Sequence, residues 1–140
     1  ELEIILRLVL ATIIGVILGI EREYVGKPAG MRTYALATLG AAVFTIISIY
    51  GFSDSGGVID ASRVAAQIVT GIGFLGAGLI IVRGEKVEGL TTATGLWVSA
   101  AIGMAVGAGM YIVAASAAIF AFIIMVVMRK FSIGKRTGAK

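Results

Sequence analysis

Two groups of polar residues interrupt an otherwise apolar chain, and both contain residue types that could pair with one another or bind an ion. The first group joins two apolar runs, and its candidate residues are Glu21, Arg22, Glu23, Lys27, Arg32 and Thr33. Two carboxylates flanking an arginine, followed by a Lys-Pro-x-Gly turn and a second arginine, could form an ionic network or the mouth of an ion pathway. Alternatively, these side chains are solvated and only anchor a helix at a membrane surface.

The second group lies further along the chain and consists of Asp60, Arg63, Gln67 and Thr70. The last three lie three or four residues apart, so they share one face of a helix. Lipid penalises such a polar face, and we expect it to point into a helix bundle or a hydrated cavity. Asp60 could instead cap the helix, accepting backbone amide protons, with Arg63 as its ionic partner.

Several classes of chemistry are excluded by the residues that the sequence lacks. It contains no histidine and no cysteine, so it has neither an imidazole base nor a thiolate, and it lacks the commonest zinc ligands. No nucleophile and base form a recognisable pair, and we expect no enzymatic activity. Magnesium prefers carboxylates together with retained waters, which leaves Asp60, Glu21 and Glu23 as weak candidates for binding it. We expect no other cofactor.

The elements that carry these groups are long apolar runs. The 140 residues include only 12 basic and 8 acidic ones, and 59% are hydrophobic, a composition that excludes a soluble globular domain. About 20 residues cross a bilayer core, and Gly107-Ala108-Gly109 divides the longest run. We therefore predict five membrane-spanning helices, at residues 4–20, 33–52, 64–82, 91–106 and 110–128. The predicted fold is an all-α integral membrane protein, a compact bundle of five transmembrane helices over residues 1–128, followed by a basic, disordered tail at 129–140.

The basic residues predict how this bundle is oriented. With five spans, ten of them fall on one side: Arg22, Lys27, Arg32, Arg83, Lys86, Arg129, Lys130, Lys135, Arg136 and Lys140. Only Arg7 and Arg63 fall on the other. Because basic connections stay in the cytoplasm, we expect the N-terminus and the Asp60 group outside, and the C-terminus and the Glu21 group in the cytoplasm. The basic residues are scattered between apolar blocks, so we expect no nucleic-acid partner.

Small residues recur where helices must approach closely. Helix association in lipid depends on packing, and small residues four apart permit backbone contact. Such residues are Ala11, Gly15 and Gly19 in the first span, Gly71, Gly73, Gly76 and Gly78 in the third, and Thr91, Gly95, Ser99, Gly103 and Gly107 in the fourth. We expect those of the first and fourth spans to face other helices, either within one chain or across a homodimer. The third-span glycines could pack helices together or line a pathway.

Three long motifs follow one another along the chain. They are Gly19-Ile-Glu21-Arg22-Glu23 with Lys27-Pro28-Ala29-Gly30-Met31-Arg32-Thr33, the segment from Asp60 to Gly78, and the segment from Gly89 to Gly103 that contains Thr91, Thr92 and Trp97. Together they resemble the N-terminal membrane domain of the MgtC/SapB family of bacterial inner-membrane proteins. The resemblance covers residues 4 to about 128, and it adds Thr92 and Trp97 to the candidate packing or pathway residues.

The resemblance implies a multi-pass inner-membrane protein linked to magnesium homeostasis and growth in low magnesium. Relatives in pathogens are associated with survival inside macrophages, and some restrain the F-type ATP synthase, which makes such a membrane complex a candidate partner. The sequence lacks the ACT-like cytoplasmic domain of longer relatives. Functions housed in that domain are therefore not expected of these residues.

Two functions remain open. The first is a regulatory membrane protein, expected to be a homodimer, that binds another membrane complex. It is favoured because no acidic residue lies near the middle of a predicted span, where ion-coupled carriers place an ionisable group. The second is a transporter or channel for magnesium, another cation or a small solute, with the Arg63, Gln67 and Thr70 face lining the path. Hydroxyl groups of Thr38, Thr45, Ser48 and Ser99 would complete its polar lumen.

Overall fold

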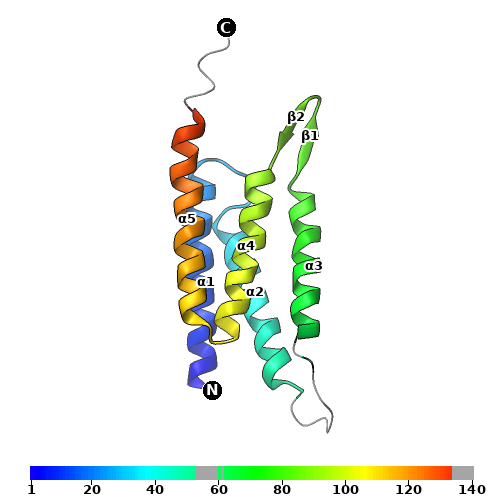
Figure 1. The fold of residues 1–140 in the computed structure, drawn as a ribbon, viewed down its shortest axis with the longest axis vertical. Helices are drawn as coiled ribbons and strands as arrows, with labels where there is room; N and C mark the ends of the chain where they lie inside the picture. Colours follow the sequence, from blue (N-terminus) through cyan, green and yellow to red (C-terminus); the bar gives the residue numbers. More distant parts are fainter. Residues whose placement is uncertain (53–59, 61, 134–140) are drawn as a thin grey trace.

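The structure, a computed structural model, describes residues 1–52, 60 and 62–133, excluding the side chains of 130–133. Its elements are α1 (Leu2–Tyr24), α2 (Met31–Tyr50), α3 (Ser62–Gly78), β1 (Ile81–Arg83), β2 (Lys86–Glu88), α4 (Leu90–Gly107) and α5 (Tyr111–Ile133), as Figure 1 shows. In the described residues, α1, α2, α4 and α5 are long and apolar enough to cross a membrane. The predicted all-α membrane fold with five helices is therefore confirmed. Helix α3, with 17 residues, rises about 25 Å and is shorter than a typical bilayer core of about 30 Å.

Helices α1, α2 and α4 form the centre of the bundle, and small residues bring their backbones into contact. A Cβ atom added to Gly15 of α1 would lie 2.7 Å from the Ala35 Cα atom, and one added to Gly103 of α4 would lie 2.1 Å from the Thr38 carbonyl oxygen. No side chain fits in such spaces. The expectation that the small residues of the first and fourth spans face other helices is confirmed, within one chain. Thr91 is the exception, because it is exposed while Thr92 is buried.

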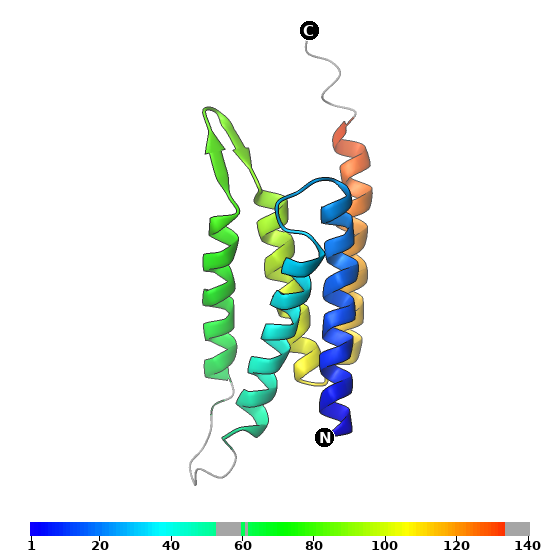
Figure 2. The ribbon, with the colours of Figure 1, turned by 180° about the vertical axis from the view of Figure 1, so that it is seen from behind.

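The two remaining helices lie at opposite edges of the bundle. Helix α5 packs against α4 and α1, whereas α3 packs mainly against α4 and more sparsely against α2. Both views of the ribbon show α3 standing at one edge and α1 with α5 at the other (Figures 1 and 2). Much of the outward surface of α1 and α5 consists of large aliphatic and aromatic side chains, as lipid contact requires.

The predicted break in the longest apolar run is confirmed, but the third span ends earlier than predicted. Gly109, with a φ of 78°, makes the turn between α4 and α5. Helix α3 ends at Gly78, and residues 81–88 form an exposed antiparallel hairpin in which Val82 pairs with Val87. Apolar composition suits a strand as well as a helix, and the β-branched residues 80–82 followed by Gly84, with a φ of 60°, favour the hairpin.

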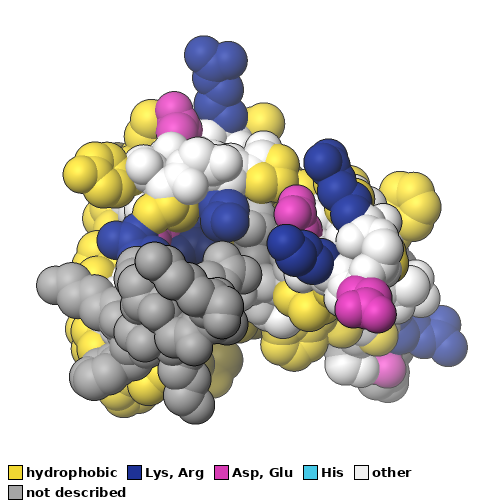
Figure 3. All heavy atoms as spheres, turned by 90° about the horizontal axis from the view of Figure 1, so that it is seen from above, with side chains coloured by type: hydrophobic (Ala, Val, Ile, Leu, Met, Phe, Trp, Pro, Cys, Tyr) yellow, Lys and Arg dark blue, Asp and Glu magenta, His cyan; other side chains and the backbone are white. Residues whose placement is uncertain are grey.

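The connections sort the charged residues between the two ends of the bundle. The α1–α2 connection, the hairpin and the last turn of α5 lie at one end, which we call the basic end, while the start of α1 and the α4–α5 turn lie at the other (Figures 1 and 2). Viewed from above, lysine, arginine and acidic side chains are spread over the basic end (Figure 3). Seven of the ten basic residues predicted to share one side lie in these segments or in the helix turns next to them, and residues 135, 136 and 140 lie outside the described residues.

Candidate functional site

A buried ionic cluster closes the basic end of the bundle between α1 and α5. Glu21 and Arg22, in the last turn of α1, are only 6% and 3% exposed. The Arg22 guanidinium donates to Glu21 Oε2 through Nε and pairs with the same oxygen through Nη2. Arg129 of α5 donates from Nη1 to Glu21 Oε1, at 3.1 Å. Both oxygens of the carboxylate are therefore held by guanidinium groups, and we call these three residues the Glu21 cluster.

Only part of the predicted ionic network belongs to this cluster. Glu23 accepts a hydrogen bond at 3.0 Å from the backbone N–H of Met31, so it satisfies a free amide at the start of α2. Lys27, Arg32 and Thr33 are exposed, and none of them has a side-chain hydrogen bond or ion pair within the described parts of the chain. The network therefore divides into a closed cluster, a helix cap and a free basic surface.

Arg129 was missed as a cluster member, because the sequence places it in a disordered tail beginning at residue 129. The structure corrects that boundary, since α5 continues to Ile133. One feature of the sequence does indicate that Arg129 lies near Glu21. Arg129 is the first charged residue after the apolar run of 89–128, and in a five-span bundle that run ends on the same side as Glu21.

A second cluster, centred on Arg7, lies at the opposite end. Arg7 is 8% exposed, and its guanidinium donates to the Gly107 carbonyl oxygen at 2.7 Å, to the Glu3 carboxylate at 2.5 Å and to the Tyr111 hydroxyl at 3.2 Å. The Tyr50 hydroxyl accepts a longer bond at 3.4 Å, and the Tyr50 ring centroid lies 5.9 Å from Arg7 Cζ. This Arg7 cluster connects α1 with the end of α2 and with the α4–α5 turn.

Sequence reasoning missed the Arg7 cluster because its members are far apart along the chain. In the sequence, Arg7 is a single charged residue near the end of a predicted span, where a membrane helix tolerates one. Its partners Gly107 and Tyr111 lie 100 and 104 residues away along the chain. The only local signal is Glu3, one helical turn before it. The polar residues at this end of the bundle core are therefore those around Arg7, and not the predicted group around Asp60.

Replacing Arg7 with methionine should lower the free energy of unfolding by about 2 kcal/mol, because hydrogen bonds to charged groups are each worth about 1.5 to 3 kcal/mol and the Gly107 carbonyl loses its side-chain donor. Thermal unfolding in detergent, followed by circular dichroism, measures this change. The matched control is Arg32→Met, which removes an exposed arginine and should leave the transition unchanged. Equal transitions for the two variants would contradict the assigned role of Arg7.

The predicted polar face of α3 does not point into the bundle. Arg63, Gln67 and Thr70 are all exposed, because α3 packs on its neighbours through the opposite side, where Ile72 and Gly76 are buried. The expectation of an inward-facing surface is therefore wrong for the isolated chain.

Asp60 acts as the capping residue that the sequence allowed. Its Oδ1 atom accepts hydrogen bonds from the backbone N–H of Ser62, at 3.0 Å, and from the Ser62 hydroxyl, at 2.5 Å. These two bonds, with a smaller contribution from the positive charge of Arg63, hold the pKa of the Asp60 carboxyl below its ordinary value. Asp60 and Arg63 do not form a direct ion pair in the structure.

The glycines of α3 also differ from their prediction. Added Cβ atoms at Gly71, Gly73 and Gly78 would have nothing within 4 Å, and only one at Gly76 would touch a neighbour, Ala93 of α4, at ordinary contact distance. Three of these four glycines thus serve no packing contact inside the chain. In α1 and α4, by contrast, Gly15, Gly19, Gly103 and Gly107 lie against backbone atoms at the start of α2 or within it, and Gly95 lies against the Tyr34 side chain.

The hydroxyl groups that could line a lumen are occupied within the α2–α4 interface. Thr38 and Ser99, both fully buried, lie 2.6 Å apart through their hydroxyl oxygens, and Tyr34 donates to the Thr92 carbonyl oxygen at 3.0 Å. Thr45 donates to the Ala41 carbonyl oxygen of its own helix. Trp97 is half-exposed, and Gly95 sits against the Tyr34 hydroxyl. The hydroxyl groups of Tyr34, Thr38, Thr45 and Ser99 thus have partners inside the chain.

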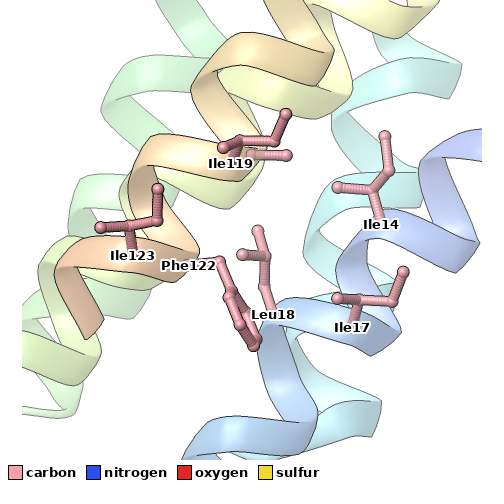
Figure 4. A pocket seen from close by; sticks show the side chains of 7 residues that line it. Ile14, Ile17, Leu18, Ile119, Phe122 and Ile123 are labelled. Atoms are coloured by element: carbon pink, nitrogen blue, oxygen red, sulfur yellow. The ribbon is translucent and has the colours of Figure 1, made fainter. Parts of the chain in front are cut away.

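Two grooves on the surface of the bundle are lined almost entirely by apolar side chains. One of about 290 Å³ lies between α1 and α5, where Leu18 and Phe122 face each other among isoleucines (Figure 4). The other, of about 440 Å³, lies between α2 and α3, with Gln67 as its one side chain bearing an amide. Across the described residues, no three carboxylate side chains come together as a metal site would require. Asp60 lies at the start of α3 and Glu21 in the last turn of α1, so the candidate magnesium ligands are not brought together.

Comparison with known proteins identifies relatives of this architecture. The chain is 52% identical over 113 residues to the Escherichia coli K12 protein named "Putative magnesium transporter YhiD". These residues make up 78% of this chain and 53% of the relative. It is 44% identical over 126 residues to Protein MgtC of Salmonella typhimurium, covering 90% of this chain and 52% of that protein. It is 41% identical over 130 residues to the Synechocystis protein slr0014, and the matched residues cover 93% of this chain and 54% of that protein.

The chain thus spans about half the length of the curated relatives that it matches. No solved structure matches it. The sequence model of the MgtC family matches residues 8–133, a range that includes the Glu21 cluster, the α3 face and parts of all five helices. A match of that extent means that the chain belongs to the MgtC family.

Proposed function

We propose that this chain is the membrane domain of a protein that acts in magnesium homeostasis by binding another membrane component, and that it neither carries ions nor catalyses a reaction. The link to magnesium comes from the relatives, one of which carries the name "Putative magnesium transporter YhiD". Because the chain spans about half of each relative, the activity of a whole relative is part of the proposal. The family resemblance supports an inner-membrane location, and the positive-inside rule supports an orientation with the basic end in the cytoplasm.

The observation that carries the proposal is the closed core of α1, α2 and α4. Backbone contacts at Gly15, Gly19, Gly103 and Gly107 leave no room for a side chain, let alone for a hydrated ion. In the described residues, every buried polar side-chain atom has a hydrogen-bond partner within the chain. None of these buried donors and acceptors is therefore left unpaired to bind a substrate. Transporters, in contrast, keep ionisable groups or broken helices around a central site.

The surface suits partner binding better than the interior suits transport. Arg32 and Lys27 are exposed at the basic end, and apolar grooves open on the lipid-facing sides of α1 and α3. A helical membrane complex, such as the F-type ATP synthase implied by the family resemblance, could be contacted through such surfaces. Magnesium itself fits the Glu21 cluster poorly, because both carboxylate oxygens already accept from arginines.

Purified protein in liposomes should show no magnesium uptake above that of empty liposomes, measured with an entrapped magnesium-sensitive dye, since no polar path crosses the core. The same preparation should give circular dichroism of a folded helical protein. Saturable uptake that depends on the folded protein would contradict this prediction.

One observation favours a transport function as the second candidate. Gln67 and Thr70 are exposed on α3, and such a face could line a path formed between chains. If uptake were found, Gln67→Leu should abolish it while leaving the helical content unchanged. Uptake that survives this substitution would remove the α3 face from the pathway.

A further inference from the structure

We propose that the exposed polar face of α3 is the surface through which two copies of this chain associate, side by side and with parallel α3 helices. The face is made of Arg63, Gln67, Thr70 and Phe74, with Asp60 before it, and we call it the α3 seam. This inference does not depend on the proposed role in magnesium homeostasis, since it concerns association alone.

The first argument is the chemistry of the seam in a membrane. Gln67 lies in the second turn of α3, whose other exposed side chains are mostly apolar or small, and its amide has no hydrogen-bond partner among the described residues. An amide facing lipid is unfavourable, and glutamine side chains in membranes bond across helices. A glutamine amide both donates and accepts, so two copies of Gln67 satisfy each other.

The second argument is the spacing of the seam. Arg63, Gln67, Thr70 and Phe74 follow one another at intervals of four, three and four residues, the repeat that keeps one line of side chains facing a parallel partner helix. Phe74 is 80% exposed. Gly71 and Gly78, beside this line, have open space around their backbones, which allows a second helix to approach closely.

The third argument is charge complementarity at the start of α3. Asp60 and Arg63 carry opposite charges three residues apart and form no direct ion pair in the chain. A contact between identical surfaces is reciprocal, so the Asp60 carboxylate of each copy can lie beside the Arg63 guanidinium of the other. Helix α3 is free to form such a contact because its opposite side is the one that packs on α4.

Cysteine cross-linking in membranes tests the seam, and the natural absence of cysteine makes every single-cysteine variant unambiguous. Under mild oxidation, Gln67→Cys, Thr70→Cys and Phe74→Cys should give disulfide-linked dimers in several-fold higher yield than Val69→Cys and Gly73→Cys. The last two are matched controls, exposed on the same helix at similar depth but off the seam. Equal yields, maxima at 69 or 73, no dimers, or adducts with a different protein would each overturn the proposal.

Substitutions at the seam give a second, independent measurement. Gln67→Leu should lower the association constant in detergent or lipid by at least about threefold, the average worth of one hydrogen bond between membrane helices. Asp60→Lys and Arg63→Glu should each reduce the cross-linking yield of Thr70→Cys, and the double substitution should restore it. Arg63 and Gln67 are exposed, so their substitution should not change the helical content. The double variant also lacks the Asp60 cap, so a recovery of its cross-linking yield reports the charge contact and not the cap. A double variant that cross-links no better than the single ones would overturn the reciprocal contact.

Discussion

Gly103→Ala should lower the free energy of unfolding by about 3 kcal/mol, although it adds only one methyl group. The new Cβ atom would lie 2.1 Å from the Thr38 carbonyl oxygen and 2.9 Å from its carbonyl carbon. These are backbone atoms of α2 and cannot rotate away, so α2 and α4 must separate. Inserting extra atoms into a well-packed core lowers the stability of a protein by about 1 to 3 kcal/mol. We expect a value at the upper end because the clash is with backbone. The fluorescence of the single tryptophan, Trp97 of α4, reports the unfolding transition in detergent.

Gly73→Ala is the matched control, because it makes the same chemical change in a membrane helix where nothing lies within 4 Å of the added atom. The protein should keep its stability or gain up to about 1 kcal/mol, since alanine is the better helix former. A loss at Gly73 equal to the loss at Gly103 would contradict the assignment of the Gly103 cost to contact between α2 and α4.

Glu21→Leu should lower the free energy of unfolding by about 3 kcal/mol. The substitution removes the only carboxylate of the Glu21 cluster and leaves the Arg22 guanidinium, with a side chain 4% exposed, without its counter-charge. Breaking a buried pair by removing one partner costs about 3 to 5 kcal/mol. We take the lower value because Arg129, with a side chain 33% exposed, can turn toward water.

Two further variants separate charge from packing in this cluster. The double variant Glu21→Leu with Arg22→Leu should recover most of the loss, because a buried pair replaced by apolar residues of similar volume is often neutral. Glu23→Gln keeps a hydrogen-bond acceptor for the Met31 amide and should cost less than about 1 kcal/mol. The assignment would be contradicted if the double variant were less stable than Glu21→Leu. Chemical unfolding in detergent measures all three.

The Gly103 and Glu21 variants test the two kinds of contact that stabilise the bundle. The interior of the bundle is held by backbone contact at small residues, while its two ends are held by the Arg7 and Glu21 clusters, about 21 Å apart along α1 at 1.5 Å per residue. The two arginines that the clusters bury, Arg7 and Arg22, are thereby kept out of contact with lipid. The exposed polar side chains of α3 are the exception to this arrangement, and for that reason they carry the proposed association surface.

The sequence by itself determined the helices, the break between α4 and α5, the sorting of basic residues to one end, and the small residues that pack α1 and α4. These features are local. A run of about 20 apolar residues must cross the bilayer whatever its neighbours are, and Gly107-Ala108-Gly109 ends a helix by its own backbone preference. The prediction failed locally at 79–82, where apolar composition does not distinguish a helix end from a hairpin strand, and at 129–133, where α5 continues into the predicted tail.

The tertiary structure alone decided which side of each helix faces a neighbour. Lipid and a helix interface are both apolar, so the composition of a membrane helix does not reveal its rotation about its own axis. The sequence analysis consequently predicted that Arg63, Gln67 and Thr70 face inward, whereas the structure shows that they are exposed. It also missed Arg7 and Arg129, whose partners lie 100 to 108 residues away. Such pairs form only when the helices that carry them have packed together.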